Sequence, residues 1–460
     1  MVLSKAYLQS FIGDRAFYKK ALLVMIPIII QQLINTLFNV VDNLMVGQIS
    51  GVAMSAVTVA NKPSLIYYGL FFGITGAGGL MLSQFFGAGE EKKCQSIFAL
   101  EMILGFACAL IFCAVMYFFA EPVMRLFVSD AETIALGVSY LEIVAFSYLP
   151  AAISTTCMFA MRALGHTKTP MFLSLLAMAL NGIFNFCFIF GHFGAPEMGV
   201  AGAALGTLVA RVCEMALYLI ILSKRSAFFG LNMKAVAGLG KNVFSSFVKK
   251  ALPLTINEIL WTSGLSIYFW AYARVDEAAL PALAISDLVV QIGFVISMGM
   301  ASAISVIVGT RLGAGEFDMA KDNAKKLLTL SCTMALLSTI VGLAMSVVLP
   351  GVFNVATSMQ QLAKQLSWLG AAFYLPNAVY GFCFFLLRAG GDTKNAALLD
   401  SGYMWVLPVP VAILMGLFGQ GRISVILAML IVQLLMNAKV VIAMIVVRKG
   451  KWIRNITQDT

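Results

Sequence analysis

Charged residues are scarce in this chain. Only 11% of its 460 residues are Asp, Glu, Lys or Arg, whereas 61% are hydrophobic, and the mean hydropathy is +0.93. Soluble domains carry about 25% charged residues. This scarcity excludes a soluble globular protein and places most of the chain in a lipid bilayer.

The residue patterns of most enzymes and of ATP-driven pumps are also missing. The sequence has two histidines, His166 and His192, in different predicted loops, and its eight cysteines show no CxxC spacing. These facts argue against zinc sites, disulfides and His-based catalytic triads. No GxxxxGK[ST] loop occurs, so we expect no enzyme, no cofactor and no ATP hydrolysis. An ion gradient is the expected energy source.

Long apolar runs are abundant instead, and a helix needs about 20 mostly apolar residues to cross the hydrocarbon core. We predict an all-α membrane protein with twelve transmembrane helices. The predicted spans are 21–46, 53–83, 94–120, 132–161, 170–191, 198–223, 248–274, 279–311, 320–348, 358–388, 394–419 and 422–448. The first is a full span that aligns with an internal one, so we do not expect a cleaved signal peptide.

The two halves of the chain resemble each other. When the sequence is shifted by 226 positions, the separation of Pro27 and Pro253, Gly87-Ala88-Gly89-Glu90 falls on Gly313-Ala314-Gly315-Glu316. Each half holds six predicted spans, an even number, so the halves are parallel repeats. Such duplication is typical of transporters that work by alternating access. The predicted domains are an N-lobe at 1–223, a cytoplasmic linker at 224–247 and a C-lobe at 248–460.

Basic residues indicate which face is cytoplasmic. Of the 31 Lys and Arg residues, 24 fall on one side of the predicted membrane, at span ends or in loops, four fall on the other, and three, Lys62, Arg211 and Lys439, lie deeper within spans. By the positive-inside rule both termini are cytoplasmic. The net charge of +10 follows from this topology and indicates contact with the lipid bilayer, not with nucleic acid. We expect a multi-pass protein of the cell inner (plasma) membrane that works as a monomer.

Acids inside spans are the chemically informative residues, because an ionised carboxylate at mid-bilayer costs at least about 2.5–3.5 kcal/mol. Glu214 follows Arg211 by three residues, which predicts a neutral structural pair. Asp287 and Asp400 have no obvious partner on their own helices. The seven predicted acids are Asp42, Glu101, Glu142, Glu214, Glu258, Asp287 and Asp400.

Asp42 is the strongest candidate for a coupling site. It lies in the outer half of the first span, Asn181 and Asn185 share one face of the fifth, and Thr207 lies at a comparable depth on the sixth. A buried amide without a partner costs about 1–3 kcal/mol, so such a set implies mutual hydrogen bonds or water. The alternatives are an interfacial helix cap for Asp42 and helix-packing contacts for the two asparagines.

At these residues the chain resembles the multidrug and toxic compound extrusion (MATE) family of secondary transporters. The resemblance covers essentially the whole chain. It implies a V-shaped fold of two six-helix lobes, and export of organic, often cationic and aromatic compounds in exchange for inward H⁺ or Na⁺. The matching motifs are V-D-x-x-x-V-G at 41–47, G-A-G-E at 87–90 and 313–316, R-A-x-G-x-T-K at 162–168 and 388–394, and N-x-x-x-N with G-V-x-G-A-A-L-x-T across 181–207.

The resemblance also implies a cation-coupling pocket in the N-lobe, formed by Asp42, Asn181, Asn185 and Thr207, with no metal ion except Na⁺ at Asp42 as an alternative to H⁺. Two departures argue against a sodium site in the C-lobe. Asn377 stands where sodium-coupled NorM-type members have an aspartate, and Glu258 comes about one turn before their acid. Our candidates for substrate binding, if they face a central cleft, are Glu258, Trp261, Tyr268, Asp287, Tyr374 and Asn377.

Our hypothesis for the coupling mechanism is centred on Asp42. Burial disfavours its charged form, so it can take up a proton from outside, after which the first span can repack and release the drug. Pro27 removes one backbone hydrogen bond from the same helix and is our candidate hinge, with a helix-start proline as the alternative.

Three other functions are less consistent with the sequence. A lipid-linked oligosaccharide flippase of the same broad superfamily would be expected to carry more basic residues inside its spans. A channel needs a ring of equivalent residues, but the lobes differ at Asp42 and Tyr268. An intramembrane enzyme needs paired catalytic residues or a metal cluster, for which the sequence offers no pattern.

Overall fold

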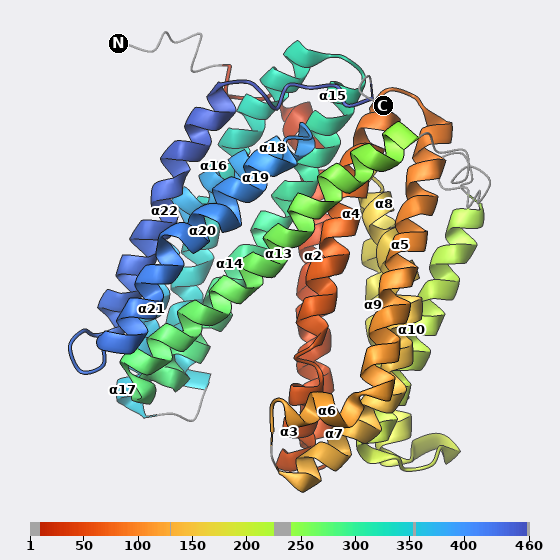
Figure 1. The fold of residues 1–460 in the computed structure, drawn as a ribbon, viewed down its shortest axis with the longest axis vertical. Helices are drawn as coiled ribbons and strands as arrows, with labels where there is room; N and C mark the ends of the chain where they lie inside the picture. Colours follow the sequence, from red (N-terminus) through yellow and green to blue (C-terminus); the bar gives the residue numbers. More distant parts are fainter. Residues whose placement is uncertain (1–9, 129, 225–240, 353–355, 458–460) are drawn as a thin grey trace. The chain divides into compact units, whose positions relative to one another are not determined.

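A computed structural model of the chain describes residues 10–128, 130–224, 241–352 and 356–457. Every regular element within these ranges is a helix (Figure 1), which confirms the predicted all-α fold.

The first half of the chain contains the helices that carry the first six predicted spans. They are α2 (Arg15–Gly47), α3 (Gly51–Ala60), α4 (Ser64–Gly87), α5 (Glu91–Phe118), α6 (Ala120–Arg125), α7 (Ala131–Val144), η1 (Ala145–Ser147), α8 (Tyr148–Ala163), α9 (Lys168–Phe190), η2 (His192–Gly194) and α10 (Gly199–Ser223).

The second half follows the same plan and includes two π-helical turns, η4 and η5. Its elements are α13 (Lys241–Val275), η3 (Glu277–Ala279), α14 (Leu280–Ile304), η4 (Ser305–Gly309), α15 (Thr310–Gly313), α16 (Phe317–Val352), α17 (Thr357–Ala372), α18 (Tyr374–Ala389), α19 (Thr393–Ala397), η5 (Leu398–Gly402), α20 (Tyr403–Val406), α21 (Pro408–Phe418) and α22 (Val425–Arg448).

The predicted spans all fall on these helices. Within the described residues, nine helical segments are long and apolar enough to cross a membrane. Together α17 and α18 are also long and apolar enough to form one broken span, with a bend of 45° between the two helices. The two remaining predicted spans coincide with α13 and with α14 and its continuation, so helices account for all twelve predicted spans.

One predicted span is broken. The span predicted at 53–83 consists of α3, which ends at Ala60, and α4, which begins at Ser64. Pro63 lies between them, and a proline disfavours helical conformation in the residue before it. Lys62 therefore lies in an exposed turn, and its predicted position inside a span is wrong.

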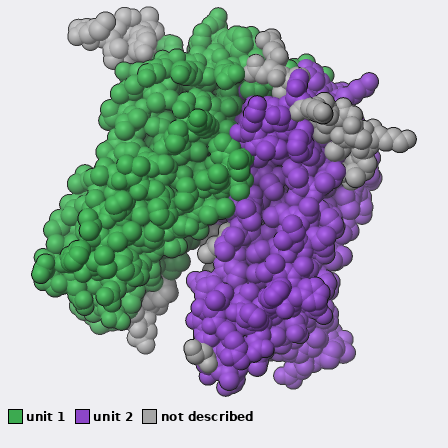
Figure 2. All heavy atoms as spheres, viewed as in Figure 1, with its two compact units in different colours: residues 1–29, 87–89, 252–460 green, residues 30–86, 90–251 purple. Residues whose placement is uncertain are grey.

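The chain folds into two compact units, coloured separately in Figure 2. One comprises residues 1–29, 87–89 and 252–460, and the other comprises 30–86 and 90–251. The boundaries thus fall inside α2, just after Pro27, and inside α13, just before Pro253. Of the predicted linker, residues 225–240 lie outside the described residues, and 241–247 form the start of α13.

The sequence repeat is visible in the backbone of the turns. Gly89 and Gly315 have φ values of 74° and 76°, and Gly165 and Gly391 have values of 84° and 79°. A glycine in this left-handed region commonly ends a helix. The amide N–H that follows each glycine donates to a carbonyl five residues earlier, at 2.8–3.0 Å. Equivalent positions of the two halves thus end their helices in the same way.

Gly390 shows where the repeats differ. A Cβ at this position would lie 1.9 Å from the carbonyl oxygen of Trp452, because the segment after α22 packs on the end of α18. Asn455 holds that segment by donating to the carbonyl of Gly313 at 3.0 Å. The equivalent residue of the first repeat is Leu164.

Gly390→Ala is therefore expected to lower stability by about 1–3 kcal/mol, the usual cost of overpacking. Thermal unfolding of the purified protein in detergent measures the loss. Gly381→Ala, within α18, is the control, since a Cβ there meets nothing within 4 Å. Equal unfolding temperatures for the two variants would contradict the packing described at Gly390.

Candidate functional site

The four predicted pocket residues form one hydrogen-bonded chain within the second unit. Asn185 on α9 donates from Nδ2 to Oδ1 of Asp42 on α2, at 2.6 Å. The same nitrogen lies 3.2 Å from Oδ1 of Asn181, one turn earlier. Asn181 in turn donates to Oγ1 of Thr207 on α10, at 3.2 Å. Three helices thus supply one polar cluster inside an apolar lobe.

Burial makes these contacts energetically important. Asn181 and Asn185 are buried, whereas Asp42 and Thr207 are half-buried. The mutual hydrogen bonds meet the requirement that the sequence imposed on buried amides. One acceptor, Oδ1 of Asn185, has no hydrogen-bond partner among the described residues, so the cluster can accept a further donor, such as water.

Glycines on α10 bring it against α9. A Cβ at Gly206 would lie 2.2 Å from Oδ1 of Asn185, and a Cβ at Gly202 would lie 2.2 Å from the carbonyl of Phe188. Between the helices, Gly191 adopts a φ of 71°, and Met198 N–H donates to the carbonyl of Phe188 at 2.9 Å. The G-V-x-G-A-A-L-x-T motif therefore sets the helix spacing on which the pocket depends.

Charged and phenolic neighbours surround Asp42. Arg211, one turn after Thr207 on α10, and Tyr140 on α7 interact electrostatically with it. Arg211 also forms the predicted pair with Glu214, at 2.8 Å, which confirms that interpretation. Burial favours the neutral form of Asp42, whereas the amide donor and the nearby guanidinium favour its ionised form, so the two protonation states are held in balance by opposing effects.

Metal-ion binding by a cluster of acids, cysteines or histidines finds no support in the described residues. No group of three such side chains is close enough to hold an ion. The oxygens that a sodium ion would need at Asp42 are those of Asn181, Asn185 and Thr207.

The six candidate substrate residues make separate contacts within the first unit. Trp261 and Tyr268 join one apolar cluster, and Tyr268 also bonds the sulfur of Met436 at 3.2 Å. Tyr374 is buried and donates to the carbonyl of Val289 at 3.2 Å. These contacts indicate packing roles for the two tyrosines.

The remaining three candidates are polar. Asp287 is exposed on α14 and accepts from Gln291 at 2.7 Å. Asn377 is exposed on α18. Glu258 lies 3.7 Å from Arg388, so it already has a basic neighbour.

Sequence reasoning missed two polar clusters whose members come from distant helices. Arg162 on α8 donates to Oε1 of Gln31 on α2 at 2.5 Å. Asp400 on η5 pairs with Lys439 on α22 at 2.8 Å. A signal for the second pair was present, because Lys439 was one of only three basic residues predicted to lie deep within spans.

Pro27 lies inside α2, twelve residues after its start at Arg15. The alternative interpretation as a helix-start proline is therefore wrong. Its missing N–H removes one hydrogen bond from the helix that carries Asp42. Its role as a hinge stays a prediction.

Comparison with known proteins gives a family match in both halves. The family model described as MatE matches residues 27–187 and 253–414, well over half of the chain. YisQ of Bacillus subtilis, named as an uncharacterized transporter, is 24% identical over 392 residues, covering 85% of this chain and 86% of that protein. A probable multidrug resistance protein NorM of Bacillus cereus is 21% identical over 406 residues, covering 87% and 89%.

Solved structures give the same result for the fold. The MATE transporter VcmN of Vibrio cholerae, in its bent form, superposes with a TM-score of 0.84 and 17% identity, covering 95% of this chain and 98% of that one. An outward-facing multidrug resistance transporter of the same family gives a TM-score of 0.81 at 16% identity, covering 95% of each chain.

Proposed function

The chain belongs to the MATE family of membrane transporters, and from this premise we propose that it is a secondary active multidrug efflux antiporter. It exports organic, often cationic and aromatic compounds in exchange for inward H⁺, with Na⁺ as the alternative ion. The observation that carries the proposal is the hydrogen-bonded pocket in which Asn185 donates to Asp42 at 2.6 Å. The names of the NorM relatives agree with multidrug export.

The pocket favours a proton as the coupling ion. Asp42 is its only ionisable member, and a proton needs one carboxylate oxygen. Hydrogen bonds within the pocket already occupy one oxygen of Asp42 and the side-chain oxygens of Asn181 and Thr207. A sodium ion would have to compete with these bonds for its ligands.

Protonation of Asp42 changes the pocket locally. The ionised carboxylate accepts a charge-assisted hydrogen bond from Asn185, and neutralisation weakens that bond. α2 is then held less firmly to α9 in its outer half. With one backbone hydrogen bond missing at Pro27, α2 has a place to bend as the drug leaves.

The cellular setting belongs to the same proposal. The excess of basic residues on one side of the predicted spans, 24 against four, supports an orientation with both termini in the cytoplasm of a cell whose inner (plasma) membrane the chain crosses. The transporter works as a monomer in the lipid bilayer and needs no cofactor besides its coupling ion.

Ethidium transport into everted membrane vesicles tests the proposal, with the proton and sodium gradients collapsed separately at a fixed membrane potential. We expect transport to stop with the proton gradient and to continue without a sodium gradient. Dependence on sodium alone would assign the coupling to Na⁺. Absence of ethidium transport, together with movement of a labelled lipid-linked oligosaccharide, would favour the flippase.

A further inference from the structure

A stripe of polar residues runs along α10, within the second unit, from the Asp42 pocket toward the C-terminal end of the helix. Its members stand at intervals of four, three and four residues, so they share one face of the helix. They are Thr207, Arg211, Glu214 and Tyr218. At about 1.5 Å per residue, the stripe is about 16 Å long. Its first member belongs to the pocket, and the other three lie beyond it.

Arg211 and Glu214 form the charged part of the stripe. Nη1 of Arg211 donates to Oε2 of Glu214 at 2.8 Å. The Glu214 side chain is only 7% exposed, whereas that of Arg211 is 30% exposed. Arg211 also interacts electrostatically with Asp42. One guanidinium thus serves two carboxyl groups inside the same unit.

The charges of Asp42, Arg211 and Glu214 balance only when one proton is bound. With both acids ionised, the three residues carry one net negative charge, and an uncompensated charge inside a membrane protein is costly. One proton on either acid makes them neutral. In the structure Arg211 pairs with Glu214, so the charge balance assigns the proton to Asp42.

Other titratable side chains surround these three residues. Those that interact electrostatically with them, or with their direct neighbours, are Tyr68 on α4, Glu101 on α5, Tyr140 on α7, Cys157 and Arg162 on α8, and Tyr218 on α10. Arg162 interacts with Tyr218, and Glu101 interacts with Cys157. Phenols and thiols are ordinarily uncharged near neutral pH. Among the acids of this set, Asp42 and Glu214 are the two that interact with Arg211.

The C-terminal repeat builds the equivalent helix, α22, without charges at these positions. At the 226-residue offset, the correspondence is Arg211 with Asn437, Glu214 with Val440, and Asp42 with Tyr268. A buried ion pair is often no more stabilising than neutral residues of similar size. The fold of the repeat thus does not require the pair, which occurs in the half that carries Asp42.

We propose that Asp42, Arg211 and Glu214 form a triad that holds one proton between its two acids, so that Glu214 is an inner proton-carrying residue. This rests on the proposed antiport. Asp42 receives the proton from outside. Its O–H bond then breaks, an O–H bond forms at Glu214, and Arg211 changes its partner from Glu214 to the ionised Asp42. A water molecule can relay the proton by taking one as it gives up another, since Oδ1 of Asn185 has no hydrogen-bond partner among the described residues.

The triad gives the proton a direction along α10. Glu214 lies nine residues before the end of this helix at Ser223, which the proposed orientation places at the cytoplasmic face. Tyr218 lies one turn closer to that end, and its buried hydroxyl has no hydrogen-bond partner within the described part of the chain. A hydroxyl both donates and accepts hydrogen bonds, so Tyr218 is placed to pass the proton onward. The proton thus leaves through the interior of the lobe.

The pH dependence of ethidium binding to the purified protein in detergent tests the triad, because an antiporter's drug and proton compete. Glu214→Gln leaves Arg211 to pair with Asp42, which favours the ionised acid. The midpoint of binding should then move to lower pH, by about one unit. Arg211→Asn removes the positive charge, which favours protonated Asp42, so the midpoint should move by a similar amount to higher pH.

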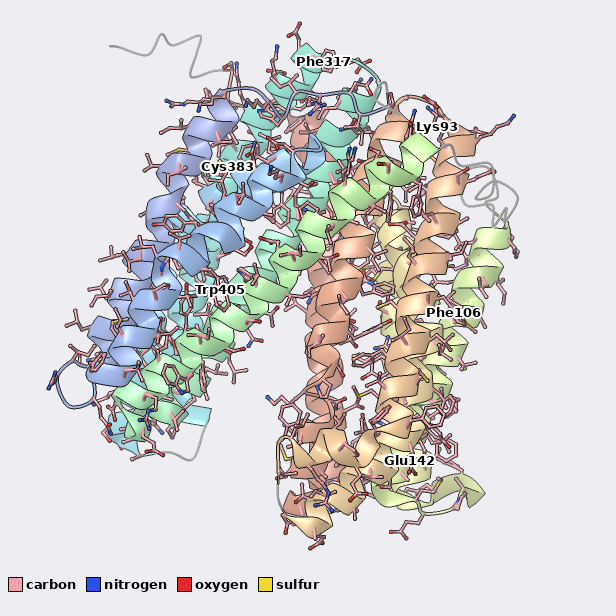
Figure 3. The ribbon with its side chains drawn as sticks, viewed as in Figure 1. Lys93, Phe106, Glu142, Phe317, Cys383 and Trp405 are labelled. Carbon is pink, nitrogen blue, oxygen red and sulfur yellow. The ribbon has the colours of Figure 1, made fainter. Side chains whose placement is uncertain are left out.

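The chain supplies matched variants for this test. Arg211→Asn/Glu214→Val gives α10 the residues of α22, and its midpoint should lie between those of the single variants. Arg211→Lys keeps the charge and should stay closer to the parent than Arg211→Asn. Glu121→Gln and Arg125→Gln each break an exposed 2.7 Å ion pair on α6 and should not move the midpoint. Neither should Glu142→Gln, at an exposed acid of α7 labelled in Figure 3.

The outcomes are distinguishable. Midpoints of Glu214→Gln and Arg211→Asn that equal the parent's, or that move in the same direction, would overturn the triad and leave the antiport at Asp42 intact. If Arg211→Asn does not fold, Glu214→Gln decides alone, since the arginine that it leaves behind is partly exposed. Ethidium binding by the parent that does not depend on pH would overturn proton exchange, and with it the triad.

Discussion

Asp42→Asn is expected to abolish accumulation driven by a pH gradient. The asparagine still offers an oxygen to Asn185, so the fold around α2 should persist, but it cannot carry a proton. Each coupled proton contributes about tenfold to the accumulation ratio per unit of pH gradient. We therefore expect ethidium accumulation in everted vesicles to fall to its equilibrium value under a gradient of one pH unit, at matched expression.

Glu142→Gln is the matched control for this experiment. It removes an acid that lies on an exposed face of α7 and belongs to no part of the pocket. Accumulation by Asp42→Asn at the level of this control would mean that another group carries the coupling proton.

Gly206→Ala is expected to impair coupling nearly as strongly. The added methyl group would lie 2.2 Å from Oδ1 and 2.9 Å from the backbone nitrogen of Asn185. The Asn185 side chain must then move, which breaks its 2.6 Å hydrogen bond to Asp42. We expect a stability loss of about 1–3 kcal/mol together with loss of pH-driven transport.

Two further glycine variants separate packing from coupling. Gly202→Ala forces α9 and α10 apart at a backbone contact with Phe188, whereas Gly182→Ala on α9 meets nothing within 4 Å. If helix separation alone mattered, Gly202→Ala and Gly206→Ala would reduce transport equally at matched amounts of folded protein. The contact with Asn185 predicts a larger loss for Gly206→Ala, and Gly182→Ala should behave like the parent.

The fold was largely predictable because its signals are local or periodic. Apolar runs of the required length give the spans, and the 226-residue repeat gives the two halves. The repeated glycine turns, such as those at Gly89 and Gly315, end helices because the glycine adopts a left-handed backbone conformation. The break at Pro63 was missed because the apolar run continues through it, although proline is a known helix breaker.

The candidate site was predictable only in part. The spacing of Asn181 and Asn185 by one helical turn predicts that they share a helix face. Their distance from Asp42, by contrast, depends on how closely α9 and α10 approach each other. Asp400 and Lys439 are 39 residues apart on different elements, so spacing along one helix could not pair them. Tyr268 and Tyr374 were predicted from an assumed cleft, whereas their hydroxyls bond to groups inside the packed helices.

Proton release on drug binding tests the central claim most directly. Ethidium is added to the purified protein in detergent and weak buffer, and a pH indicator counts the protons released per ethidium bound. We predict that Asp42→Asn releases one proton fewer than the parent, because the carboxyl group that exchanges with the drug is gone. Equal proton release by the parent and by Asp42→Asn would contradict a coupling role for Asp42.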